Sequence, residues 1–257
     1  VPIFGLRQGV KLEERDQPLN QYHLLEKAGI RLPKLFDSPD QIDRLVIVKV
    51  NEATRGYERS FFFAHDKKSF EEESVKKVEK GEINQSDLDK AVIEEYVIGA
   101  HINLNFFYSE LNQELELMGT DTRRQTDLDG FLRLPFNEQR TLHRMGFKPK
   151  MIETGHYAVT MKESLVEKAY DIGEKFVATM KKEVAPGMIG PFALQGAVAA
   201  YEGKEEFVIF DVSMRIPGSP GTKFTPYSGY LYGESLSYGE RIAMEINQAV
   251  QENRLPE

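Results

Sequence analysis

A predicted β-hairpin in the last third of the chain carries an amide and a carboxylate at matched positions. Apolar segments flank the polar turn Glu202-Gly203-Lys204, and Gln195 and Asp211 lie equally far from Gly203. Directly opposed residues of an antiparallel pair share a face, with Cβ atoms ~5 Å apart. Mg²⁺ takes such oxygen ligands together with substrate phosphates. The spacing therefore predicts a metal site, and a solvated outer strand face is the alternative.

A lysine and a charged strand end could contact a nucleotide. Lys49 ends the β-branched segment 44–50, where it could neutralise phosphates as a point charge. An ordinary edge-strand lysine is the alternative. Residues 94–97 end another strand-like segment, where backbone groups could contact a base and a carboxylate could hold ribose hydroxyls. A charged sheet edge is equally consistent with that pattern.

Three arginines and one histidine are weaker candidates for ligand contacts. Arg123, Arg124 and Arg215 could each bind phosphate bidentately or form a surface ion pair. His156 is the only one of the five histidines that lies between turn and strand signals, and a structural role is its alternative. The sequence contains no Walker loop, Rossmann fingerprint or nucleophile elbow.

The elements that must position these residues form an α/β segment followed by an antiparallel one. Residue patterns predict strands at 44–50, 60–64, 92–97, 102–109 and 114–119, and flanking the turn at Gly203. They predict helices at 16–29, 69–79, 163–183 and 239–252, and loop-rich stretches at 120–155 and 216–232. This order is typical of an α+β architecture with a cleft between two subdomains.

Composition excludes several classes of protein. The 257 residues contain no cysteine, which excludes disulfides, thiolate nucleophiles and Cys–zinc sites. The net charge is −8 and the basic residues are scattered, so no nucleic-acid partner is expected. No apolar segment approaches the ~20 residues of a membrane span, and no signal-peptide pattern is present. We therefore expect a cytoplasmic protein without a membrane partner.

The order of Lys49, residues 94–97, Gln195 and Asp211 resembles the layout of the ATP-grasp fold. There, a strand lysine, an adenine-contacting strand and a metal-bearing hairpin surround ATP. The phrases VPIFG, LLEKAGIRLPKLFDSPDQID, IEEYVIG, PGMIGPFALQ and FDVSMRI make nearly the whole chain similar to the archaeal FAICAR synthetase family. These enzymes are formate–AICAR ligases of purine biosynthesis.

This resemblance implies a reaction and a set of residues. ATP with Mg²⁺ or Mn²⁺ would activate formate as formyl phosphate, which the amine of AICAR would attack to give FAICAR, ADP and phosphate. A homo-oligomer acting on small molecules (formate, AICAR or analogues) is expected. The implied ATP contacts are Lys49, Arg55, Gly56, Glu94, Glu95, Tyr96, Val97, Asn103 and Gln125. The other implied roles are substrate binding by Arg123 and His156, metal binding by Gln195 and Asp211, and catalysis by Arg215.

The resemblance also implies domain boundaries. Residues 1–30 would be a linker and helix after an N-terminal domain. Residues 31–100 would form the ATP-grasp subdomain with the lysine strand, the loop and the adenine-contacting strand, and residues 101–257 the subdomain with the metal-binding hairpin. ATP would lie in the cleft between these two α/β subdomains.

Four positions depart from the family pattern. The family has asparagine at His156, and glutamate at Gln125 and at Asp211. It also has a glycine-rich loop where this chain has NEATRGYERSFFF. We expect AICAR, if it is used, to bind more weakly than in typical members. Two alternatives stay open: a diverged ATP-grasp ligase joining another carboxylate to another amine, and a non-catalytic nucleotide-binding paralogue.

Overall fold

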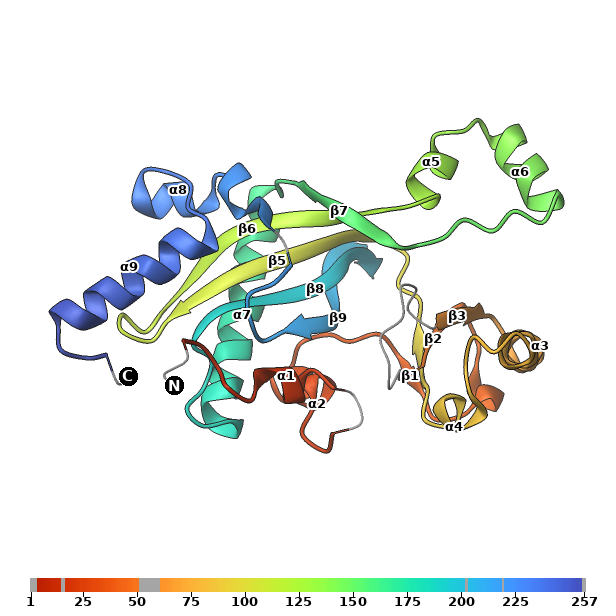
Figure 1. Cartoon of the computed structure of the whole chain (residues 1–257), viewed down its shortest axis with the longest axis horizontal. Coiled ribbons are helices and arrows are strands. Elements are labelled where there is room, and N and C mark those ends of the chain that lie inside the picture. Colours follow the sequence, from red (N-terminus) through yellow and green to blue (C-terminus); the bar gives the residue numbers. More distant parts are fainter. Residues whose placement is uncertain (1–3, 15–16, 51–60, 202, 219, 256–257) are drawn as a thin grey trace. The chain divides into compact units, whose positions relative to one another are not determined.

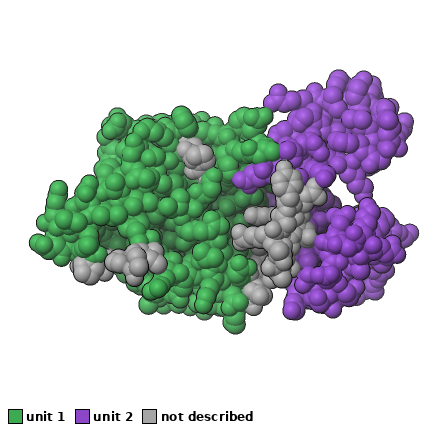
Figure 2. Space-filling view, viewed as in Figure 1, with its two compact units in different colours: residues 1–32, 99–124, 154–257 green, residues 33–98, 125–153 purple. Residues whose placement is uncertain are grey.

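The computed structural model describes residues 4–14, 17–50, 61–201, 203–218 and 220–255. The chain divides into two compact units, which Figure 2 distinguishes by colour. Unit 1 comprises residues 1–32, 99–124 and 154–257, and unit 2 comprises residues 33–98 and 125–153. The architecture is mixed α+β with one antiparallel sheet in each unit, which confirms the predicted fold class.

Unit 1 is built on a five-stranded sheet in the order β7-β6-β5-β8-β9 (Figure 1). The bounds of its strands are β5 Ala100–Ser109, β6 Glu114–Gln125, β7 Glu153–Ala158, β8 Gly190–Tyr201 and β9 Lys204–Ser213. Along β5 the apolar residues Ile102, Leu104 and Phe106 alternate with Asn103 and Asn105. Because successive side chains point to opposite faces, the sheet has one apolar and one largely polar face at this place.

The long helix α7 (Glu163–Glu183) covers the apolar face of this sheet. Its apolar side chains recur at helical spacing, and Phe176 stacks on Phe192 of β8 with ring centroids 5.7 Å apart. Phe192 in turn stacks on Phe106 of β5 at 5.2 Å. The predicted helix at 163–183 is confirmed at both ends, because the 3.6-residue period marks it along its whole length.

The remaining helices of unit 1 lie at the two ends of the chain. They are α1 (Gly9–Leu12), α2 (Gln21–Lys27), α8 (Tyr227–Tyr232) and α9 (Tyr238–Gln251), together with the 3₁₀ turn Pro220–Phe224. The α2 helix begins after Asn20, whose side chain caps the amides of Tyr22 and His23. Ser237 and Glu240 form a capping box that starts α9. Such caps satisfy amides that have no partner inside the helix.

Unit 2 contains a four-stranded sheet in the order β1-β4-β2-β3. Its strands are β1 Leu35–Phe36, β2 Val46–Lys49, β3 Phe61–Ala64 and β4 Val92–Glu95. Its helices are α3 Lys67–Glu79, α4 Gln85–Leu88, α5 Leu128–Leu132 and α6 Phe136–Arg144, and a 3₁₀ turn lies at Pro39–Gln41. Val46, Val48 and Phe62 lie in its buried core. Ile47 and Lys49 alternate with Val46 and Val48 along β2, so their side chains point to the other face, where they are only partly buried.

Two predicted loop regions are in fact partly regular. The stretch 120–155 contains the end of β6, the helices α5 and α6, and the start of β7. The stretch 216–232 contains a 3₁₀ turn and α8. Neither α5 nor α6 has a buried residue, and at five and nine residues both are too short for an apolar period to identify them. No helix in the described ranges is long and apolar enough to cross a membrane.

Candidate functional site

The hairpin β8–β9 brings Gln195 and Asp211 directly opposite each other. Its turn is tight, with Tyr201 opposite Lys204, and the register continues regularly to Gly196 opposite Ile209. A β-bulge at Phe210 then shifts the register by one residue, and the pairing resumes with Gln195 opposite Asp211. The predicted pairing is therefore confirmed, and it depends on this bulge, because an uninterrupted ladder would place Phe210 opposite Gln195.

The side chain of Gln195 is almost completely buried and has two identified partners. Its oxygen accepts a hydrogen bond from Nη2 of Arg123 on β6. Its nitrogen donates to Oγ of Ser213 at 3.2 Å. Asn103 of β5 lies opposite Gln195 on the other side of β8. The predicted residues Gln195, Asp211, Arg123 and Asn103 thus lie on one polar face of the sheet.

A second polar cluster on this face centres on the fully buried carboxylate of Asp121. It accepts hydrogen bonds from Nδ2 of Asn103 at 2.8 Å and Nδ2 of Asn105 at 2.6 Å. Its Oδ2 also lies 2.5 Å from Nδ1 of His156 on β7. Because Nδ1 faces Asp121, the other ring nitrogen of His156, Nε2, points away from that carboxylate.

Arg215, predicted to be catalytic, follows the end of β9. Its Nη2 lies 3.3 Å from Oε2 of Glu13, and the other oxygen of Glu13 accepts the backbone N–H of Met214 at 2.7 Å. Burial raises the pKa of Glu13, and the nearby charge of Asp211 acts in the same direction. Glu13 comes from the N-terminal part of the chain, so no local sequence pattern indicates this contact.

The oxygen groups of Gln195 and Asp211 fit a divalent cation of the Mg²⁺ type. They share one face and supply one amide and one carboxylate, as Mg²⁺ sites that also use phosphate oxygens require. Within the described part of the chain, no group of three or more His, Cys, Asp or Glu residues could hold a metal ion. A cation held by these two oxygens would need further ligands, such as phosphate or water oxygens.

In unit 2, Lys49 forms an ion pair with Glu94. Ile47 of β2 lies opposite Glu94 of β4, so Lys49 and Glu94 are diagonal neighbours on one face. The side chain of Glu94 is 2% exposed and that of Lys49 22%. Two residues predicted to contact ATP are therefore in contact with each other.

The remaining predicted ATP contacts have varied surroundings. Glu95 accepts the backbone N–H of Lys34 at 3.2 Å and pairs with Arg44 at 3.4 Å. The ring of Tyr96 contacts Phe63 edge-on at 5.2 Å, and burial raises the pKa of its hydroxyl. Val97 is buried and Gln125 ends β6. Arg55 and Gly56 lie outside the described residues.

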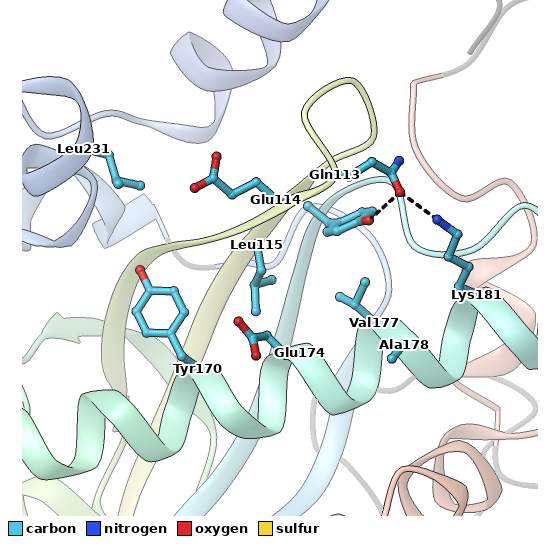
Figure 3. A pocket seen from close by; sticks show the side chains of 10 residues that line it. Gln113, Glu114, Leu115, Tyr170, Glu174, Val177, Ala178, Lys181 and Leu231 are labelled. Carbon is cyan, nitrogen blue, oxygen red and sulfur yellow. Dashed lines mark hydrogen bonds between the residues drawn. The ribbon is translucent and has the colours of Figure 1, made fainter.

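A hollow of ≈ 590 Å³ lies between the β5–β6 turn and α7 (Figure 3). At one side of it, Oε1 of Gln113 accepts hydrogen bonds from Tyr108 at 3.2 Å and Lys181 at 2.6 Å. None of the residues predicted from the sequence lines this hollow. The candidate site in unit 1 therefore lies on the polar face of the sheet and not in this hollow.

Sequence reasoning missed Asp121, Asn105, Ser213 and Glu13. Residues 120–125 are all polar, so no alternation marks the strand beyond its predicted end at 119; extending the two-residue strand period would have placed Asp121 and Arg123 on one face. Asn105 and Ser213 follow from the same period. The carbonyl oxygen of Asn105 is buried and has no hydrogen-bond partner among the described residues, so water or a ligand must supply one.

Comparison with known proteins agrees with this geometry. The family described as a domain of unknown function, DUF1297, matches residues 69–257. A 5-formaminoimidazole-4-carboxamide-1-(beta)-D-ribofuranosyl 5'-monophosphate synthetase from Methanothermobacter thermautotrophicus is 39% identical over 260 residues, which cover 100% of this chain and 69% of that protein. An IMP biosynthesis protein PurP from Thermococcus kodakaraensis is similar in structure, with a TM-score of 0.68 and 30% identity over 98% of this chain and 70% of that one.

A more distant structure shares the fold alone. D-alanine–D-alanine ligase from Bacillus anthracis, complexed with ATP, has a TM-score of 0.56 at 15% identity and covers 98% of this chain and 71% of that one. The two antiparallel sheets and the helices that cover them define an ATP-grasp protein. Within that superfamily, the chain belongs to the PurP family of FAICAR synthetases.

Proposed function

We propose that this protein is an ATP- and divalent-metal-dependent ligase that formylates AICAR with formate, through formyl phosphate, to give FAICAR, ADP and phosphate. The observation that carries the proposal is the opposed pair Gln195 and Asp211 on the hairpin of a PurP-family chain. A bound Mg²⁺ or Mn²⁺ would neutralise phosphate charge. Catalysis of this type is mainly positioning and electrostatic stabilisation, so it requires no nucleophilic side chain.

Each proposed role follows from the chemistry of the side chain. Gln195 and Asp211 would hold the metal, and Arg123 and Arg215 would bind phosphate oxygens bidentately. Lys49 would contribute a point charge to the phosphates, with Glu94 holding its ammonium group in place. Residues 94–97 would contact the base and ribose. His156 would contact the amine substrate, with Asp121 fixing the orientation of its ring.

A second candidate is a ligase of the same mechanism with a different amine substrate. The observation in its favour is the contact between His156 and Asp121. An asparagine amide can donate and accept through one planar group, whereas the two ring nitrogens of His156 point in different directions and Nδ1 already contacts Asp121. A substrate whose recognition needs a donor and an acceptor side by side at this position would be bound less well.

The test is ADP release by the purified protein with ATP, Mg²⁺, formate and AICAR, with each component omitted in turn. ADP release that needs both formate and AICAR, and yields FAICAR by mass, supports the proposal. Formate-dependent ADP release that AICAR does not stimulate favours the different amine. Absence of any carboxylate-dependent ADP release overturns the ligase assignment.

A further inference from the structure

The amide of Gln195 is held in one orientation by two neighbours. The guanidinium of Arg123 donates to its oxygen, and Oγ of Ser213 accepts from its nitrogen at 3.2 Å. A guanidinium has donors and no acceptor, so the end of the amide that faces Arg123 must be the oxygen. The atom that would bind a metal ion therefore already faces a permanent positive charge.

This arrangement opposes the binding of a bare divalent cation. A cation at the oxygen of Gln195 would lie a few ångströms from the guanidinium, and like charges at that distance repel strongly where burial limits screening by water. Gln195 is 8% exposed, so screening here is limited.

We propose that Arg123 is an internal counter-cation that makes metal binding at Gln195 and Asp211 conditional on nucleotide phosphate. The inference rests on the proposed function, which assigns these two residues to the metal. Phosphate oxygens remove the conflict because their negative charge attracts both cations. They also offer the guanidinium a bidentate partner in exchange for the single oxygen of Gln195. The metal would then bind as the metal–nucleotide complex and not alone.

The neighbouring arginine on the same strand provides a matched control. Arg124 follows Arg123 on β6, so its side chain points to the opposite face of the sheet. Its guanidinium lies over the ring of Tyr157, 4.8 Å from the centroid. Neutralising Arg124 changes the net charge of the protein as much as neutralising Arg123 does, and it leaves Gln195 untouched.

The experiment measures the affinity for free Mn²⁺ and for Mn²⁺ with a non-hydrolysable ATP analogue, by titration calorimetry or by the electron paramagnetic resonance signal of free Mn²⁺. We expect Arg123→Gln to bind free Mn²⁺ at least about fivefold more tightly than the wild type, and the Mn²⁺–nucleotide complex at least about fivefold more weakly. Arg124→Gln should stay within about twofold of the wild type in both titrations. Opposite signs for Arg123→Gln are the signature of a counter-cation.

Two further variants make the result decisive. Arg123→Met retains the aliphatic stem and replaces Arg123→Gln if that variant does not fold, as judged by circular dichroism. Asp211→Asn reports on the metal site itself and should weaken Mn²⁺ binding in every background. If Asp211→Asn weakens Mn²⁺ binding but neutral Arg123 variants change both affinities in one direction or neither, the counter-cation inference is wrong. If Asp211→Asn leaves the affinity for Mn²⁺ unchanged, the metal site of the proposed function is wrong, and so is the inference that rests on it.

Discussion

Arg241 of α9 donates two hydrogen bonds of 2.7 Å to the carboxylate of Glu116 on β6, and both side chains are almost completely buried. Its Nη2 also lies 2.8 Å from Glu245, one helical turn further along α9. Glu245 accepts from the hydroxyl of Ser109 at 2.8 Å. This buried ionic cluster fixes the C-terminal helix to the five-stranded sheet.

Removal of Arg241 should therefore destabilise the protein strongly. Arg241→Ala leaves two buried carboxylates without their cation, and breaking such a pair typically costs about 3–5 kcal/mol. Urea denaturation followed by circular dichroism measures this free energy. Lys175→Ala, which removes an exposed pair with Asp171 on α7, should change it by less than about 1 kcal/mol. Equal effects of the two substitutions would contradict a structural role of the cluster.

Glu13 should make stability depend on pH. Burial raises its pKa in the folded protein, so the folded state holds this proton more tightly than the unfolded state does. The stabilisation linked to that proton is complete below the ordinary pKa of a glutamate and is lost as the pH rises through the raised value. Glu13→Gln mimics the protonated form, so its free energy of unfolding relative to the wild type should increase from pH 4 to pH 7. Glu14→Gln, at an exposed neighbouring carboxylate, should show a smaller change over this range.

Lys49→Ala should cost stability even without nucleotide. The substitution leaves the buried carboxylate of Glu94 without its cationic neighbour, which typically costs about 1–3 kcal/mol. A double-mutant cycle with Glu94→Gln separates this pair from other effects. Additive losses in that cycle would show that the two side chains do not interact in solution.

Asp211→Ala should remove most of the stabilisation that ATP gives in the presence of Mg²⁺ or Mn²⁺. A ligand at about 100 times its dissociation constant adds about 2.7 kcal/mol to the free energy of unfolding. Thermal unfolding with ATP and metal, with ATP alone and with metal alone measures the effect. Identical shifts for the wild type and the variant would exclude Asp211 as a metal ligand.

His156→Asn should raise AICAR-dependent ADP release, since the amide offers both a donor and an acceptor. A mismatched buried hydrogen bond costs about 1–3 kcal/mol, or roughly tenfold to a hundredfold in binding. Steady-state kinetics with varied AICAR should show a lower KM for AICAR in the variant. His65→Asn, at an exposed histidine, is the matched control. A wild type that already uses AICAR efficiently, with a neutral or harmful His156→Asn, would contradict weakened AICAR binding.

The hairpin illustrates what the sequence could and could not predict. Its strands follow from apolar runs around a glycine turn, but the pairing of Gln195 with Asp211 also needs the bulge at Phe210. That bulge could not be predicted, because nothing in a β-branched and aromatic run marks where an extra residue is inserted. The contacts of Glu13 with Arg215, and of His156 with Asp121, join segments far apart in the chain, and local patterns carry no information on them.

The same limit applies to the middle of the chain. The β6 strand continues to Gln125 through the unbroken polar run 120–125, a pattern that predicts a loop. Helices α5 and α6 bury no side chain and are only five and nine residues long, whereas the apolar period of α7 extends over 21 residues. Tertiary contacts, and not local preference, decide the structure in such segments.

The C-terminal half of β9, the last strand of the five-stranded sheet, has a covered outer edge. The backbone N–H groups of Ile209, Val212 and Met214 donate to the carbonyl of Arg31 at 2.9 Å, to the side chain of Gln21 at 2.7 Å and to Glu13 at 2.7 Å. An uncovered edge offers unpaired donors to any passing strand and so invites intermolecular sheet growth. The N-terminal segment that supplies these three acceptors thus protects the edge of the sheet from pairing with another molecule. A form of the protein that begins after Arg31 should therefore precipitate more readily.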